Sequence, residues 1–115
     1  MAVGNKVRTA EYVNIRSVIY QNATPPPKYV IVESKYGSST LNPKTKDGPQ
    51  MSDDWIKGSD RLEKAIEDID IVDDIRFNLD NNPENVQKVL SEIDKSGNVT
   101  MYKINPDGSK GDLWL

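Results

Sequence analysis

Residues 28–50 have the sequence KYVIVESKYGSSTLNPKTKDGPQ, in which an apolar run leads directly into Glu33 and Lys35. Positions 28–36 are dominated by β-branched and aromatic residues, and this composition predicts a strand. Successive side chains of a strand alternate between its two faces, so Glu33 and Lys35 share one face with Ile31. The sequence therefore places a carboxylate and an ammonium group next to each other on a largely apolar strand.

A second strand is predicted just before this one. Residues 12–20, YVNIRSVIY, have the same β-rich composition. The prolines Pro25, Pro26 and Pro27 between the two runs lack amide donors and disfavour helix, so an antiparallel hairpin with a loop over residues 21–27 is expected. Residues 37–49 are rich in Gly, Ser, Thr, Asn, Pro and Lys, which predicts an exposed loop.

The middle of the chain has helical spacing. Ser52 precedes two aspartates, a pattern typical of an N-cap with an acidic first turn, and Gly58 is expected to divide the following segment into two helices. Residues 69–79 fit both helical spacing and alternation, and we favour a helix that enters a strand. Together these features predict an α/β domain with a mixed sheet flanked by helices.

The last third of the chain contains a further helix signal and a hairpin signal. Asn82 and Pro83 predict a helix over residues 83–95, which Gly97 would end. Residues 98–104 and 111–115 flank the turn sequence NPDG, which predicts a terminal hairpin or a strand with an extension. Trp55 and Trp114 are expected in the core rather than as stacking platforms for nucleic-acid bases.

Composition excludes several classes of chemistry. The 115 residues are enough for one domain, and they include no cysteine and no histidine, which excludes disulfides, zinc-thiolate sites and a histidine general base. The net charge of -3 argues against nucleic-acid binding by overall charge, so a local basic patch or metal ions would be required. No stretch approaches the roughly 20 apolar residues of a membrane span, so we expect no membrane partner.

Glu33 and Lys35 suit phosphodiester hydrolysis. A carboxylate can hold Mg²⁺, and a lysine two residues along can orient a water molecule and offset the charge of the attacked phosphate. A second carboxylate from a neighbouring strand normally completes such a site. The commoner meaning of this spacing is an ion pair on a half-solvated sheet face, and the spacing alone leaves both interpretations open.

Two blocks add a family resemblance. Residues 29–39, YVIVESKYGSS, and residues 46–56, KDGPQMSDDWI, resemble the C-terminal nuclease domains of bacterial polymorphic toxins, including contact-dependent inhibition, Rhs and LXG proteins. These domains have a core similar to the PD-(D/E)xK restriction-endonuclease superfamily. The resemblance implies a metal-dependent endonuclease, a DNase with RNase as the alternative. It would be delivered within a larger secreted bacterial effector, act as a monomer in the target-cell cytoplasm and be neutralised by a cognate immunity protein.

The resemblance also assigns residues. Glu33 would be the metal-binding acid, Lys35 the catalytic lysine and Gln50 a polar active-site residue, with Mg²⁺ as the metal and Mn²⁺ or Zn²⁺ as alternatives. The phosphate backbone of the substrate would be received by exposed cations and hydroxyls of the loop, namely Lys44, Lys46, Ser38 and Ser39.

One position departs from the family pattern. The family has an aspartate on the preceding strand, where this sequence has Arg16, so an anionic ligand is replaced by a cation. An inactive variant, engineered or natural, a metal site rebuilt with another acid such as Glu11, and a different alignment all remain open. We expect one domain over residues 1–115, and a truncated N-terminus of that domain is a further open alternative. The alternative functions are a catalytically dead binding module for an immunity protein or nucleic acid, and an interaction domain in which Glu33 and Lys35 form a surface ion pair.

Overall fold

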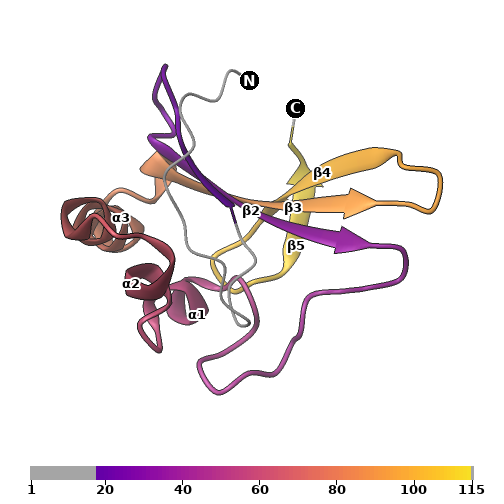
Figure 1. Cartoon of the computed structure of the whole chain (residues 1–115), viewed down its shortest axis with the longest axis horizontal. Helices are drawn as coiled ribbons and strands as arrows, with labels where there is room; N and C mark the ends of the chain where they lie inside the picture. Colours follow the sequence, from indigo (N-terminus) through magenta and orange to yellow (C-terminus); the bar gives the residue numbers. More distant parts are fainter. Residues whose placement is uncertain (1–17, 115) are drawn as a thin grey trace.

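The computed structural model describes residues 18–114, and its central element is a five-stranded mixed sheet with the strand order β1-β2-β3-β4-β5 (Figure 1). Strands β2 and β3 are parallel, and every other neighbouring pair is antiparallel. The strands are β1 (Val18–Gln21), β2 (Tyr29–Tyr36), β3 (Val86–Ile93), β4 (Val99–Ile104) and β5 (Lys110–Leu113). The predicted α/β class with a mixed sheet is therefore confirmed.

The predicted hairpin is present at the start of the described chain. Ile19 of β1 is the antiparallel partner of Ile31 of β2, and the polar, proline-containing segment after Gln21 connects the two strands. The predicted strand over residues 28–36 is confirmed within one residue. The part of the first predicted strand before Val18 lies outside the described residues.

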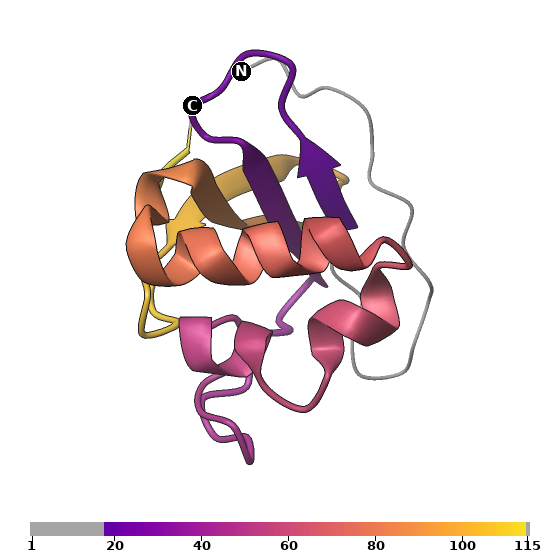
Figure 2. The ribbon, with the colours of Figure 1, turned by 90° about the vertical axis from the view of Figure 1, so that its left-hand side faces the viewer.

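Three helices connect the parallel strands β2 and β3: α1 (Asp53–Lys57), α2 (Arg61–Ala65) and α3 (Ile69–Asn81). A parallel connection needs a crossover of a dozen residues or more, and the helices supply it on one face of the sheet (Figure 2). The Ser52 hydroxyl accepts a hydrogen bond from the Trp55 N–H at 3.2 Å, which confirms the predicted N-cap. Gly58 ends α1, so the predicted division into two helices is also confirmed.

The prediction for residues 69–79 is half wrong. The whole segment is helical as part of α3, and no strand follows within it. Val72, Ile75 and Leu79 recur at helical spacing and are buried against the sheet. Ile69 and Phe77, which the alternating pattern would have buried, are 55% and 58% exposed. The segment is helical because helical spacing, unlike strand alternation, gives one continuous apolar stripe toward the core.

The helix predicted over residues 83–95 is wrong. Asn82 and Pro83 start only the 3-10 turn η1 (Pro83–Asn85), and the chain then forms β3. This strand lies between β2 and β4 and is buried for most of its length, with Val89 fully inaccessible. A central strand with a parallel neighbour carries apolar residues on both faces, and that pattern imitates the apolar face of a helix.

The C-terminal hairpin is confirmed. Strands β4 and β5 are antiparallel and are joined by a turn closed by the hydrogen bond from Gly108 N–H to Asn105 O, 2.9 Å long. Within residues 18–114, no helix combines the length and the apolar content that crossing a membrane requires.

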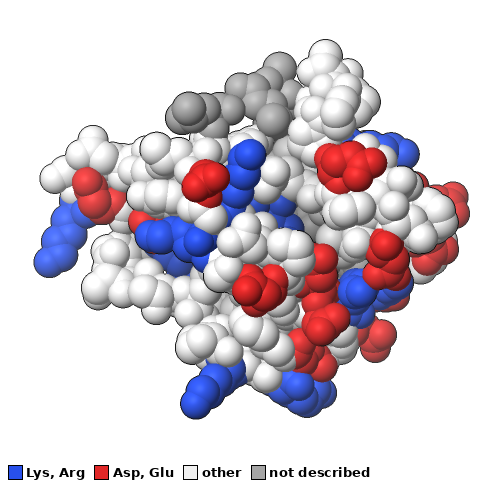
Figure 3. Space-filling model, turned by 180° about the vertical axis from the view of Figure 1, so that it is seen from behind, with Lys and Arg blue, Asp and Glu red and all other residues white. Residues whose placement is uncertain are grey.

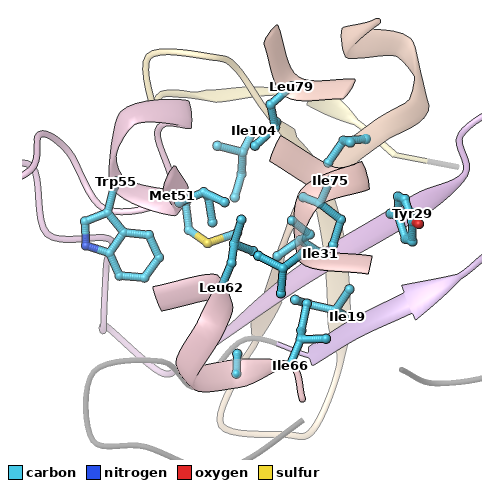
Figure 4. Close-up of a cluster of buried hydrophobic side chains, with 14 of the residues drawn as sticks. Ile19, Tyr29, Ile31, Met51, Trp55, Leu62, Ile66, Ile75, Leu79 and Ile104 are labelled. Carbon is cyan, nitrogen blue, oxygen red and sulfur yellow. The ribbon is translucent and has the colours of Figure 1, made fainter. Parts of the chain in front are cut away.

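The core lies between the helices and one face of the sheet (Figure 4). Ile31 of β2, Met51 before α1 and Ile75 of α3 are at most 1% exposed. Trp55 belongs to this cluster and is 4% exposed, whereas Trp114 is only partly buried and lies outside it. The expectation of a core position holds for Trp55 alone.

Candidate functional site

Glu33 is a buried carboxylate in the second half of β2. Its side chain is 3% exposed and shares the helix-covered face with Ile31. Among residues 18–114 it is the one acidic residue that is buried. On this face of β2 the side chains change from apolar at Ile31 to charged at Glu33 and Lys35, and Lys35 is partly exposed. Glu33 therefore occupies a buried position rather than a half-solvated sheet face.

Gln50 is brought to Glu33 by the loop that follows β2. Its side-chain amide Nε2 donates to Glu33 Oε2 at 3.4 Å, a long and therefore weak hydrogen bond. The other amide atom, Oε1, accepts from the Asn42 N–H at 2.9 Å, and the Gln50 N–H donates to Asn42 O at 2.8 Å. These two bonds to Asn42 orient the Gln50 side chain with its NH₂ group toward Glu33.

Glu92 joins this end of the sheet, and the sequence interpretation missed it. In the parallel ladder Glu33 is opposite Leu90 and Lys35 is opposite Glu92, so the two acids lie on the same face in neighbouring strands. The Glu92 carboxylate accepts a hydrogen bond from Lys110 Nζ at 3.2 Å. The helix predicted over residues 83–95 concealed this position. A strand prediction for this segment could have revealed it, because residues two apart such as Leu90 and Glu92 then share one face.

A cleft of about 460 Å³ lies next to Gln50. Three cations line it: Lys46 from the loop after β2, and Arg61 and Lys64 from α2. The remaining lining residues are Asn42, Thr45, Gln50, Trp55 and Ser59. Among the described residues of the lining there is no carboxylate, so this part of the cleft is basic although the chain as a whole is acidic. Gln50 both lines the cleft and contacts Glu33.

The predicted substrate-binding residues are not gathered in one place. Lys46 lines the cleft, whereas Lys44, Ser38 and Ser39 are exposed in the same loop and do not line it. The loop leaves the end of β2 and returns to the helices (Figure 1). Ser38 and Ser39 directly follow the end of β2 in sequence, whereas Lys46 is closer in sequence to the start of α1.

Arg61 is held rigidly at the wall of the cleft. Its Nη1 donates to Asp47 Oδ2 and to Trp55 O, each at 2.8 Å, and its guanidinium lies 4.3 Å from the centre of the Trp55 ring. Hydrogen bonds from the Ser59 hydroxyl and then from Arg61 lower the pKa of Asp47. Asp47 therefore stays ionised and fixes Arg61, while no ion pair engages Lys46 or Lys64 within residues 18–114.

A buried lysine supports the segment that carries Gln50. Lys88 of β3 is 4% exposed, and its Nζ contacts Met51 O at 2.6 Å, Asp53 Oδ1 at 2.7 Å and Asn105 O at 3.2 Å. Burial lowers the pKa of Lys88, and the hydrogen bond to Asp53 opposes that shift. Met51 has a φ of 68°, an uncommon backbone conformation for a residue other than glycine. Lys88 thus holds the backbone directly after Gln50.

The predicted metal site falls partly outside the described chain. Glu11 and Arg16 precede Val18, so their relation to Glu33 is not described. Within residues 18–114, no group of three or more acidic residues could together hold a metal ion. Glu33 is therefore the metal-ligand candidate that this part of the chain supplies in a buried position.

The chain matches no family model, no curated protein and no solved structure. The resemblance to nuclease toxin domains therefore stays a prediction that rests on two sequence blocks. The function has to be inferred from the arrangement of Glu33, Lys35, Gln50 and the basic cleft.

Proposed function

We propose that this chain is a metal-dependent endonuclease domain of the polymorphic-toxin type, with a restriction-endonuclease-like core and DNA as its substrate. One observation carries the proposal: Glu33 is buried on β2 in contact with the Gln50 amide, and Gln50 borders a cleft lined by three cations. A glutamate is rarely fully buried, so the burial of Glu33 at the polar end of β2, beside a cleft lined by cations, marks this position as a candidate site. The delivery within a larger effector and the cognate immunity protein belong to this proposal and rest on the sequence resemblance alone.

The buried carboxylate of Glu33 is an oxygen ligand of the kind that a hard cation prefers, and within residues 18–114 no group of three acids completes a site around it. Mg²⁺ is commonly bound by one or two carboxylates, with waters and substrate phosphate oxygens filling the other positions. Glu33 would supply a carboxylate oxygen, and the absence of cysteine and histidine from the sequence favours an oxygen-binding metal over zinc. When bound, the metal would supply Lewis-acid polarisation of the phosphate and an acidified water.

The chain's own residues would then divide the work of hydrolysis. The water oxygen attacks phosphorus, the bond from phosphorus to the leaving oxygen breaks, and that oxygen takes up a proton. Lys35, two residues beyond Glu33 on the same face, would stabilise the charge that develops on the phosphate. Gln50 would orient the Glu33 carboxylate, and Lys46 would attract the phosphate backbone.

A catalytically dead binding module is the second candidate. It is favoured by the lack, within residues 18–114, of an acidic cluster able to hold a metal, and by Arg16 at the position where the family has an acid. In that case the same basic cleft would bind nucleic acid without cutting it.

A plasmid-nicking assay with Mg²⁺ or Mn²⁺ separates the two candidates. We expect metal-dependent nicking by the chain or by Arg16→Asp, and its loss when Glu33→Gln is introduced into whichever of them cuts. Glu84→Gln, at an exposed acid of η1, is the matched control and should leave nicking unchanged. Activity in Arg16→Asp alone would identify a disabled enzyme, and absence of nicking in every version would refute the endonuclease in favour of the binding module.

A further inference from the structure

The cleft beside Gln50 has the charge and the lining of a polyanion site. Its three cations come from two separate segments, with Lys46 in the loop after β2 and with Arg61 and Lys64 on α2. The overall charge of the chain is -3, so this local excess of positive charge is not a consequence of composition. Asp47 is not among the described lining residues, but its carboxylate offsets the charge of Arg61, so the excess of positive charge comes from Lys46 and Lys64.

The cations differ in how they are held. Arg61 is fixed by Asp47, by Trp55 O and by the face of the Trp55 ring, and its Nε atom is buried without a hydrogen-bond partner. Lys46 and Lys64 are exposed and have no ion pair within the described part of the chain. A rigid guanidinium in the wall with two exposed ammonium groups is suited to a chain of phosphates, which needs neutralisation at several points.

The uncharged lining residues add hydrogen-bonding groups. Asn42, Thr45, Gln50 and Ser59 present amides and hydroxyls, which are typical partners of phosphate oxygens and sugars. Trp55 forms part of the lining but is 4% exposed and covered by Arg61, so it offers no free ring for base stacking. The lining therefore favours contacts to a nucleic-acid backbone rather than to bases.

Gln50 connects this cleft to Glu33. Its amide donates to Glu33 Oε2 at 3.4 Å while the residue also lines the cleft. We propose that the cleft between the loop after β2 and α2 holds the phosphate backbone of a nucleic-acid strand, with Lys64 and Arg61 as binding residues in addition to Lys46. That the bound strand is cut next to Glu33 rests on the proposed endonuclease function, whereas the binding of the strand to the cleft does not.

The test is binding without catalysis. Fluorescence anisotropy with a short labelled DNA strand, in EDTA and over a range of salt concentrations, measures affinity and its salt dependence. Replacing Lys46 and Lys64 together by glutamine should flatten the slope of log K against log salt by about 0.7 to 0.9 for each phosphate that is no longer neutralised. Affinity should fall about tenfold or more.

A matched control uses two exposed lysines away from the cleft. Lys95→Gln with Lys103→Gln changes the net charge equally, on the β3–β4 hairpin and on β4. We expect the slope of this variant to equal that of the unmodified chain. An equal effect of both double variants would overturn the proposal, because it would show a response to net charge alone. Thermal unfolding of each variant confirms that folding is preserved.

Two competitors identify the ligand class. Unlabelled DNA should displace the probe from the unmodified chain, whereas a free mononucleotide at the same phosphate concentration should not. Displacement by the mononucleotide, or by polyglutamate with the same lysine dependence, would overturn the assignment to a nucleic-acid strand. If the chain nicks plasmid while the cleft variants bind normally, the endonuclease proposal stands and the cleft proposal fails. The opposite pattern supports the cleft in a non-cutting protein.

Discussion

At the scale of single residues, the structure buries two ionisable side chains on neighbouring strands, Glu33 of β2 and Lys88 of β3. Lys88 is satisfied by Asp53 and by the carbonyls of Met51 and Asn105, so its burial has a structural explanation. Glu33 receives the long hydrogen bond from Gln50 and lies where β2 turns polar. Glu33 is the candidate for chemistry because it contacts Gln50, which borders the basic cleft, and Lys88 is the candidate for positioning because it holds the backbone directly after Gln50.

Asp74 gives the molecule a defined response to acid. Its Oδ2 accepts hydrogen bonds from Lys28 Nζ and from the Tyr29 hydroxyl, both at 2.6 Å. The contact with Lys28, followed by that with Tyr29, lowers the pKa of Asp74 below its ordinary value of 3.8. Burial and the same contact raise the pKa of Tyr29, so its hydroxyl remains a donor.

The sign of the pH effect follows from this shift. As pH falls, the unfolded state binds the proton of Asp74 before the folded state does, so the contribution of Asp74 to stability is full above pH 3.8. It is lost as pH falls through the lower, folded pKa. We expect Asp74→Asn to remove part of the acid-induced loss of stability in urea unfolding between roughly pH 5 and 2. Asp73→Asn, at the exposed neighbouring position, is the matched control because it removes one carboxylate without touching the contacts of Asp74 with Lys28 and Tyr29.

At the scale of elements, the turn between β4 and β5 supports the segment before α1. A Cβ added at Gly108 would lie 3.0 Å from Pro49 Cβ, 3.1 Å from Gln50 O and 3.2 Å from Ser52 N. Gly108 also has a φ of +90°, which disfavours other residues. The hairpin at the C-terminus is thus in contact with the residue that faces Glu33.

Two glycine substitutions separate strain from contact. A Cβ added at Gly97 meets no atom within 4 Å, and the φ there is +87°, so Gly97→Ala should cost only the backbone strain, about 1–2 kcal/mol. Gly108→Ala adds a steric clash with Pro49 and Gln50, and should cost roughly 1–3 kcal/mol more in urea unfolding. An equal loss of unfolding free energy in both variants would mean that the turn at Gly108 is not packed tightly against Pro49 and Gln50.

At the scale of the whole molecule, charge and burial are unevenly distributed. Seen from behind, acidic side chains gather mainly on the side formed by the helices (Figure 3). Val30 of β2 and Val89 of β3 are fully inaccessible, whereas β5, at one end of the described sheet, is mostly exposed. The sheet therefore combines a buried centre with a more accessible edge strand.

Hydrogen exchange should follow this division. Amides of β2 and β3 are expected to exchange only when the whole domain unfolds, while those of β5 should exchange through local opening with a smaller free energy. Native-state exchange in increasing urea distinguishes the two, because only global unfolding depends strongly on denaturant. Protection in β5 equal to that in β2 would show instead that the sheet opens as one unit.

Local chemistry made much of the fold predictable. The hairpin of β1 and β2, the N-cap at Ser52, the break at Gly58 and the terminal hairpin follow from short-range propensities and turn residues, and all appear in the structure. The candidate site was predictable where it depends on one strand, because alternation alone places Glu33 and Lys35 on one face.

Segments 69–79 and 83–95 were decided by tertiary packing. Their apolar residues fit more than one period, and only packing decides which period buries a continuous surface. In the sheet, residues 86–93 form a central strand, which places Glu92 opposite Lys35. The same strand brings the Lys88 ammonium group to the Met51 carbonyl. The basic cleft likewise joins Lys46 to Arg61 and Lys64. By itself the sequence determined the strand that carries Glu33 and Lys35, because that needs only neighbouring residues. Only the tertiary structure decided what surrounds them, because those partners lie on segments distant along the chain.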